Sequence, residues 1–237
     1  MNTAIKEFKL RNHTITLKVS EGRLFTLNAV TGLFAKVVDI NPESIVFDIG
    51  SGVGPLAIWA AKESSKKVYA VEIVKAQYTV LQENIKDNNL AHKITAYHGE
   101  FFKPIPPEVK ADVIIADVSG IAEGPARALG WYPPEIPTGG EDGTETIIPL
   151  LEQAGNYLAP GGRVYFPIAI DLSDSKKIMN IAEAKFGNLE LMVNPDFPLT
   201  EQQVSSLKPF ESPYVNIRKR GSRHIWRGAI YKATDPK

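Results

Sequence analysis

The chain has 237 residues, 43% of them apolar, which is enough for one large α/β core and a small accessory element. Lysine plus arginine equals aspartate plus glutamate at 27 each, so the overall charge predicts neither a nucleic-acid-binding nor a membrane-binding protein. The absence of cysteine excludes disulfides and thiolate chemistry, and the four histidines lack metal-ligand spacing, so no metal site is predicted. Without a signal pattern or a long apolar run, we expect a soluble, cytoplasmic protein.

Alternating apolar and polar residues from Phe8 to Phe25 predict a short β-hairpin ahead of the main fold. We therefore expect a hairpin extension at residues 1–27 and a main domain at residues 28–237. A segment with helical spacing opens the main domain. It is either a packing helix or the border of a ligand site to which Asn28 and Thr31 contribute.

The apolar run at residues 45–49 has the composition of a buried parallel strand and breaks into a glycine loop. Pro55 follows where a helix tolerates proline, at its first position. Glycines in such a turn permit positive φ and let a ligand approach the free N–H groups of the helix. Nicotinamide and flavin sites prefer G-x-G-x-x-G, but Pro55 occupies the place of the third glycine. The pattern is instead D-x-G-x-G-x-G, beginning at Asp48 and including Gly50 and Gly52.

A second buried strand, residues 67–72, ends in an acid, Glu72. A carboxylate at this place can accept hydrogen bonds from both hydroxyls of an adenosine ribose, in nicotinamide and methyl-donor folds alike. The alternative is a solvated charge at the end of the strand. After a helix and a third strand comes Glu100, a candidate acceptor for the exocyclic amine of adenine. The aromatic pair Phe101 and Phe102 follows it and either covers the purine or belongs to the core.

A fourth strand ends at Asp117, which should lie beside the reacting group because ligands bind beyond the carboxyl ends of parallel strands. The alternative role for Asp117 is a helix cap or a turn. Residues 120–143 form a long loop rich in glycine and proline, and loops of this length are usually functional or disordered. Its aromatic residues Trp131 and Tyr132 favour a substrate wall.

The last third of the chain is predicted to hold a helix, a strand, a second helix and a second strand, at residues 146–158, 163–168, 173–186 and 189–193. A capping box begins at Thr200. A hairpin with strands at residues 214–218 and 224–231 closes the chain. Five basic residues crowd its turn, where they either bind phosphate or carboxylate groups or protect a strand edge: Arg218, Lys219, Arg220, Arg223 and Arg227.

Taken in order, these motifs and a turn at residues 158–162 resemble the class I S-adenosylmethionine-dependent methyltransferases. The resemblance extends from about residue 40 to residue 231. Within that class, residues 131–134 and 139–143 look like the region that follows the Asn-Pro-Pro-Tyr motif of the HemK-like glutamine methyltransferases. This chain has Asp117-Val118-Ser119-Gly120 at the place of that motif. A carboxylate therefore stands where that family has an amide-binding asparagine, and we expect the hairpin in place of the large helical N-terminal domain of that family.

The resemblance implies a Rossmann-like α/β fold, with a mostly parallel seven-stranded sheet, an antiparallel C-terminal hairpin and a small N-terminal β-hairpin. It also implies S-adenosylmethionine as the cofactor. The residues expected to contact the cofactor are Asn28, Thr31, Asp48, Gly50, Ser51, Gly52, Glu72, Ile73, Glu100, Phe101, Asp117 and Val118.

The favoured function is methylation of a nitrogen of a small molecule, with Asp117 as the catalytic carboxylate and Glu123 as a second one. Ser119, Trp131 and Tyr132 are expected to contact this substrate. A hydroxyl acceptor, a protein side chain, an NAD(P)-binding oxidoreductase and a non-catalytic cofactor-binding module remain alternatives. The sequence leaves homo-oligomerisation open.

Overall fold

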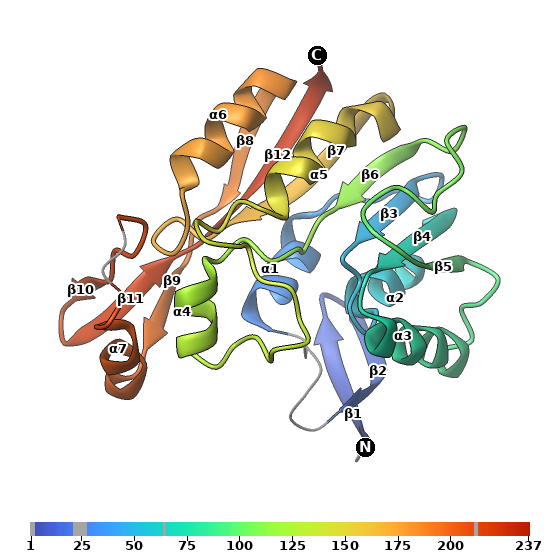
Figure 1. Cartoon of the computed structure of the whole chain (residues 1–237). Coiled ribbons are helices and arrows are strands. Elements are labelled where there is room, and N and C mark those ends of the chain that lie inside the picture. Colours follow the sequence, from blue (N-terminus) through green and yellow to red (C-terminus); the bar gives the residue numbers. More distant parts are fainter. Residues whose placement is uncertain (1–2, 21–27, 64, 211–212) are drawn as a thin grey trace.

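The computed structural model describes residues 3–20, 28–63, 65–210 and 213–237, and a seven-stranded sheet forms its centre (Figure 1). The strand order is β5-β4-β3-β6-β7-β12-β8. Strand β12 is antiparallel to both of its neighbours, whereas the other pairs are parallel. The predicted Rossmann-like fold is therefore confirmed. The strands are β3 (Ile45–Ile49), β4 (Lys67–Glu72), β5 (Ile94–His98), β6 (Ala111–Ile115), β7 (Leu158–Ile168), β8 (Phe186–Val193) and β12 (Ala229–Pro236).

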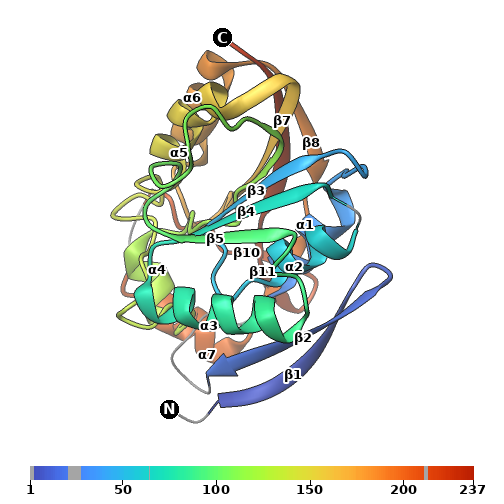
Figure 2. The ribbon, with the colours of Figure 1, turned by 90° about the vertical axis from the view of Figure 1, so that its right-hand side faces the viewer.

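Helices cover both faces of this sheet, as Figure 2 shows. Neighbouring residues on β3, Val46 and Phe47, are fully buried in two different core clusters, because successive side chains of a strand point to opposite faces. A strand buried on both faces needs a continuous apolar run, which is the pattern at residues 45–49. The helices on the Val46 side are α1 (Ala29–Val37), α2 (Pro55–Lys62) and α3 (Lys75–Asp87). Those on the Phe47 side are α5 (Ile147–Ala154), continued by the 3-10 turn η1 (Gly155–Tyr157), and α6 (Ser175–Lys185).

The N-terminal hairpin consists of β1 (Thr3–Leu10) and β2 (His13–Ser20), as predicted, and lies against the α2 and α3 layer (Figure 2). Asn84 on α3 fixes it, because its side chain accepts from the Lys18 N–H at 2.7 Å and donates to the Lys18 carbonyl at 3.2 Å. Part of the predicted hairpin, up to Phe25, lies outside the described residues. The domain boundary at residue 27 also lies outside them and stays a prediction.

A second, three-stranded sheet lies beside the main one, with the order β10-β11-β9 (Figure 1). Its strands are β9 (Asp196–Leu199), β10 (Arg218–Arg220) and β11 (Arg223–Arg227), and α7 (Glu201–Leu207) starts with the predicted capping box. The prediction of one returning strand at residues 224–231 is wrong, because Gly228 separates β11 from β12. A Cβ atom at Gly228 would lie 2.9 Å from the Phe197 ring, so the chain passes an aromatic wall there.

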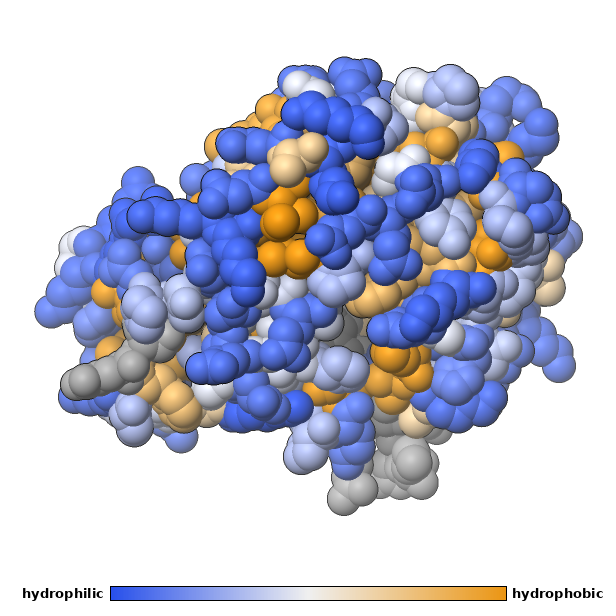
Figure 3. Space-filling view, turned by 45° about the horizontal axis from the view of Figure 1, so that its top comes forward, coloured by the Kyte–Doolittle hydropathy of each residue, from blue (hydrophilic) through white to orange (hydrophobic). Residues whose placement is uncertain are grey.

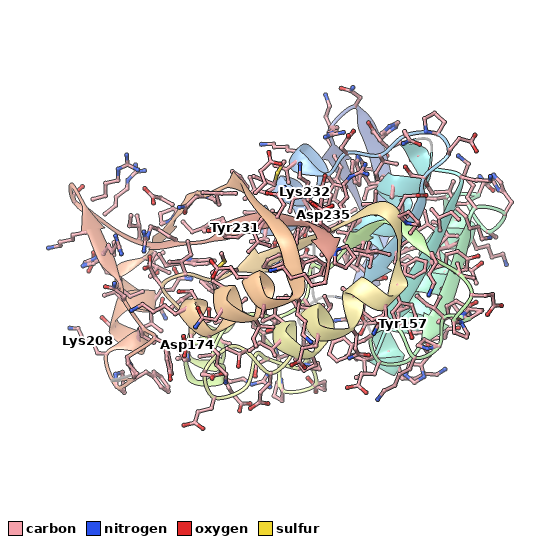
Figure 4. All side chains as sticks on the ribbon, turned by 90° about the horizontal axis from the view of Figure 1, so that it is seen from above. Tyr157, Asp174, Lys208, Tyr231, Lys232 and Asp235 are labelled. Carbon is pink, nitrogen blue, oxygen red and sulfur yellow. The ribbon has the colours of Figure 1, made fainter. Side chains whose placement is uncertain are left out.

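Two further details correct the predicted elements. The predicted strand at residues 214–218 begins only at Arg218, and the predicted loop at residues 120–143 contains a short helix, α4 (Glu123–Ala128). Two successive residues of β12, Tyr231 and Lys232, are labelled in Figure 4. Tyr231 stacks on Phe166 at a centroid distance of 5.9 Å, whereas Lys232 pairs with Glu190, because successive side chains of a strand point to opposite faces.

The face of the molecule in Figure 3 is mostly hydrophilic, and its hydrophobic side chains form small patches. Few large hydrophobic side chains are exposed in the described ranges, the most exposed being Ile5. Within the same ranges, none of the helices combines the length and the apolar character that crossing a bilayer would require.

Candidate active site

A cavity of about 930 Å³ opens beyond the carboxyl ends of β3, β4 and β6. The chain crosses from one side of the sheet to the other between β5 and β6, so β3 and β6 are neighbours at the point where the strand order reverses. Open α/β sheets bind their ligands at this place. The cavity is large enough for a cofactor and an adjoining acceptor.

The glycine loop forms one wall of this cavity, and two of its glycines, Gly50 and Gly54, leave no space for a side chain. Gly50 has a φ of +77°, and a Cβ atom there would lie 2.8 Å from Val118. Gly54 has a φ of +96° and directly precedes Pro55, the first residue of α2. Since both glycines adopt the left-handed conformation, the loop brings the backbone of β3 against the loop that follows β6. Ser51 and Gly52 also line the cavity.

Asp48 is a buried acid within this wall, and only 1% of its surface is exposed. Neither carboxylate oxygen accepts a hydrogen bond of ordinary geometry from the described residues. Burial raises the pKa of Asp48 to about 7, and contacts with Ser51 and the Ala57 N–H offset this only in part. A carboxylate of this kind is stabilised by a cation in the cavity, which fits the positively charged methyl donor.

Glu72, at the end of β4, is held by the backbone. Its two oxygens accept hydrogen bonds from the Gly52 N–H at 2.8 Å and the Val74 N–H at 2.6 Å. Burial raises its pKa, and these N–H groups work against the shift. Each oxygen keeps a second acceptor position for a ligand. Glu72 and the neighbouring Ile73 both line the cavity, as the proposed ribose contact requires.

Phe101 and Phe102, for which the sequence allowed either a purine contact or a place in the core, have different positions in the structure. Phe101, with a φ of +47°, lines the cavity next to Glu100, which pairs with Lys103. Phe102 is fully buried and stacks at a centroid distance of 4.5 Å on Tyr157, which Figure 4 labels. Phe102 therefore belongs to the core.

Asn28 and Thr31, at the start of α1, meet Asp117 at the wall of the cavity, although Thr31 and Asp117 are 86 residues apart in the sequence. The Asn28 side chain caps α1 by accepting from the Thr31 N–H at 3.0 Å. The Thr31 hydroxyl donates to the Asp117 carboxylate at 2.8 Å. Burial raises the pKa of Asp117 to about 6, although this hydrogen bond lowers it. A carboxylate with such a pKa can take up a proton near neutral pH.

Aromatic side chains line the part of the cavity beyond Asp117. The predicted residues Ser119, Trp131 and Tyr132 are here, and burial raises the pKa of Tyr132 to about 12. Sequence reasoning missed two partners, Phe197 and Trp226, which stack at 4.5 Å. Trp226 also lies 5.5 Å from Trp131, so three aromatic rings from distant segments form one wall. No local motif marks the two missed residues.

The second predicted carboxylate, Glu123, is not among the residues that line the cavity. It is the first residue of α4, is exposed, and pairs with Arg127 one turn later at 3.4 Å. The structure therefore does not bring it together with Asp117. A different acid, Glu145, lines the cavity instead.

Charges along the cavity are of one sign. The described lining residues include five acids and no lysine, arginine or histidine; the acids are Asp48, Glu72, Glu100, Asp117 and Glu145. Low-dielectric walls of one sign attract ligands of the opposite sign. The cavity therefore favours positively charged ligands.

The basic C-terminal cluster is largely neutralised by acids. Asp171, 1% exposed, accepts from Arg227 at Nε (3.0 Å) and Nη2 (2.9 Å) and from its backbone N–H at 2.8 Å, and Arg218 lies 3.5 Å away. Arg220 pairs with Asp196. These arginines fix the small sheet, and through β11 they fix Trp226 in the aromatic wall.

The fold and the cavity together define the class I S-adenosylmethionine-dependent methyltransferase fold. Residues 31–124 match the TRM5/TYW2 methyltransferase domain. In a superposition, the T. thermophilus 16S rRNA N2 G1207 methyltransferase in complex with AdoMet and guanosine gives a TM-score of 0.63 at 17% identity, covering 98% of this chain and 50% of that chain. This likeness concerns the fold.

Relatives known by sequence give the same class. A release factor glutamine methyltransferase of Moorella thermoacetica is 30% identical over 160 residues, covering 64% of this chain and 54% of its own length. Another, of Rhodopirellula baltica, is 25% identical over 210 residues, covering 83% of this chain and 70% of its own length. The chain thus spans about half the length of the first relative. Each of these compared proteins is a methyltransferase by name, and the family match covers the glycine loop and the strands β3 to β6 of this chain.

Proposed function

We propose that the protein transfers the methyl group of S-adenosylmethionine to a nitrogen of a small molecule. The observation that carries this proposal is the position of Asp117, at the end of β6 between the glycine loop and the aromatic wall. A planar or cationic nitrogen compound fits such a wall, because aromatic faces attract both. The lack of basic side chains among the described lining residues favours an acceptor without phosphate groups.

When bound, S-adenosylmethionine supplies a methyl group on a positively charged sulfur. Glu72 would hold the ribose hydroxyls, and the ionised Asp48 would face a positive charge of the cofactor. Asp117 would orient the acceptor nitrogen and take its proton, while the aromatic wall excludes water. Holding the reacting atoms about 3 Å apart provides much of the acceleration of such a reaction.

We also propose that residues 117–120 take the place of the Asn-Pro-Pro-Tyr motif. The carboxylate of Asp117 accepts the Thr31 hydroxyl at 2.8 Å and is an acceptor only, whereas an asparagine also donates to an amide oxygen. This difference favours an amine over an amide as the acceptor.

A protein side chain is the second candidate acceptor. The names of two relatives, both release factor glutamine methyltransferases, favour it. The rRNA methyltransferase that shares the fold keeps a nucleobase acceptor open as well.

Titration calorimetry and a transfer assay test the proposed function. We expect S-adenosylmethionine and S-adenosylhomocysteine to bind, and NAD and NADP not to bind. Radiolabelled donor offered with amines, phenols, peptides and RNA should label the amines. Tight binding of a nicotinamide cofactor would contradict S-adenosylmethionine as the cofactor. Label that appears only on peptide or RNA would contradict a small molecule as the methyl acceptor.

A further inference from the structure

Two acids of the cavity lining, Asp117 and Glu145, lie outside the expected contacts with the adenosine part of the cofactor. Asp117 is the less exposed of the two, and Thr31 donates to it at 2.8 Å. Glu145 both lines the cavity and is exposed, which places it at the mouth. The proposed methyl transfer uses Asp117 and leaves Glu145 without a role.

The loop that carries Glu145 is shaped around its carboxyl group. The Glu145 N–H donates to the Gly139 carbonyl at 2.9 Å, which closes the loop. Gly140 has a φ of +75°, and a Cβ atom there would lie 1.9 Å from Cδ of Glu145. The next residue, Thr146, donates its hydroxyl to the Ser119 carbonyl. The Glu145 segment is thus tied to the loop that follows Asp117.

The acids and the aromatic side chains that line this cavity suit a cation. Trp131, Tyr132 and Trp226 line the cavity, and aromatic faces attract ammonium groups. No described lining residue is basic, so no side chain of the described lining compensates the two carboxylates. Asp48, which is 1% exposed and accepts no hydrogen bond of ordinary geometry from the described residues, adds a further acid to the same cavity.

We propose that the methyl acceptor is an organic cation with two basic nitrogens, one methylated beside Asp117 and the other paired with Glu145. Glu145 is then the residue that determines specificity for the second charge. This inference rests on the proposed function and names the class of its substrate.

The methyl transfer needs only the acceptor, the methyl donor and Asp117. The ammonium beside Asp117 first gives one proton to that carboxylate, which exposes the nitrogen lone pair. This lone pair forms the new N–C bond while the C–S bond of the donor breaks and its electron pair stays on sulfur. The products are the methylated ammonium and the neutral thioether S-adenosylhomocysteine, and the proton on Asp117 leaves to solvent.

Calorimetry on the protein saturated with S-adenosylhomocysteine tests the inference without turnover. The probes are 1,4-diaminobutane and 1,6-diaminohexane, each against the monoamine of equal length, butylamine or hexylamine. The better diamine should bind about 10-fold more tightly than its monoamine, because a charged hydrogen bond adds to the affinity. Glu145→Gln should remove this difference, and Gly140→Ala should reduce it by displacing the carboxyl group.

Glu141→Gln is the matched control, because Glu141 is an exposed acid of the same loop that does not line the cavity. It should keep the preference for diamines, and all variants should bind S-adenosylhomocysteine as the wild type does. Equal affinity for diamine and monoamine in the wild type, or an unchanged preference in Glu145→Gln, would overturn the inference. Failure of the proposed function would look different: the wild type would then not bind S-adenosylhomocysteine, or would transfer labelled methyl groups only to peptide or RNA.

Discussion

The two ends of the cavity are built by different means. At the cofactor end, backbone groups do most of the positioning: two N–H groups hold Glu72, and left-handed glycines shape the loop after β3. At the acceptor end, side chains from distant segments meet, including Trp131 and the stacked pair Phe197 and Trp226. Backbone positioning suits one fixed ligand, whereas a wall of side chains can change with the acceptor. Substitutions at one end should therefore leave the other end intact.

The largest effect is expected at the junction of the two ends, from Asp117→Asn. The amide keeps the shape and still accepts from Thr31, but it loses the charge and the basicity. We expect turnover to fall about 10²- to 10⁴-fold with cofactor affinity unchanged, as for the loss of a general base. Rates of methyl transfer and calorimetry on one preparation measure both quantities.

Glu123→Gln is the control for this experiment, because it removes a carboxylate that lies outside the cavity lining. Its turnover should equal that of the wild type. If Asp117→Asn melts at a lower temperature but keeps full turnover per folded molecule, then Asp117 only anchors Thr31 and has no part in the reaction.

A smaller effect, confined to the cofactor end, is expected from Glu72→Ala. Losing a charge-assisted hydrogen bond costs about 1.5–3 kcal/mol, so affinity for S-adenosylmethionine should fall roughly 10- to 150-fold. At saturating cofactor, the KM for the acceptor should not change. Unchanged cofactor affinity in a folded variant would make Glu72 a structural acid that serves only the Gly52 and Val74 N–H groups.

The same contrast explains how much the sequence alone predicted. The cofactor end depends on short stretches in which a strand, a turn and a helix follow one another, so Asp48, Gly50 and Glu72 are recognisable by spacing. All three line the cavity. The fold was predictable for the same reason, because buried parallel strands leave continuous apolar runs.

The acceptor end was only partly predictable. Trp131 lies in a conspicuous loop, but Trp226 joins it through the pairing of β11 with β9, and strand pairing across the chain leaves no local pattern. Glu123 and Glu145 are both acids of the segment between β6 and α5. Only the direction of α4, which turns Glu123 to solvent, and the closed loop at residues 139–145 decide which of them lines the cavity.

The smallest effect is expected from a change of pH, which acts differently on Asp48 and on Asp117. Burial raises the pKa of Asp48 to about 7 and that of Asp117 to about 6, from an ordinary value of 3.8. In the folded protein without ligand, these groups therefore hold protons that the unfolded chain has lost. Their contribution to stability is complete below about pH 4 and is lost as the pH rises to about 7. The melting temperature should fall across this window, and less so in Asp48→Asn.

Cofactor binding should show the opposite trend, because a positively charged ligand prefers the ionised form of Asp48. We expect the affinity for S-adenosylmethionine to rise about 10-fold between about pH 5 and about pH 8, and to level off above the pKa of Asp48. Asp48→Asn has no charge to gain and should bind with little dependence on pH, whereas Asp117→Asn should keep most of the wild-type rise. Calorimetry at constant ionic strength measures all three proteins. A wild-type affinity that is flat with pH, or a rise that persists in Asp48→Asn, would show that the cofactor's charge does not face Asp48 and would place its partner elsewhere along the acidic wall.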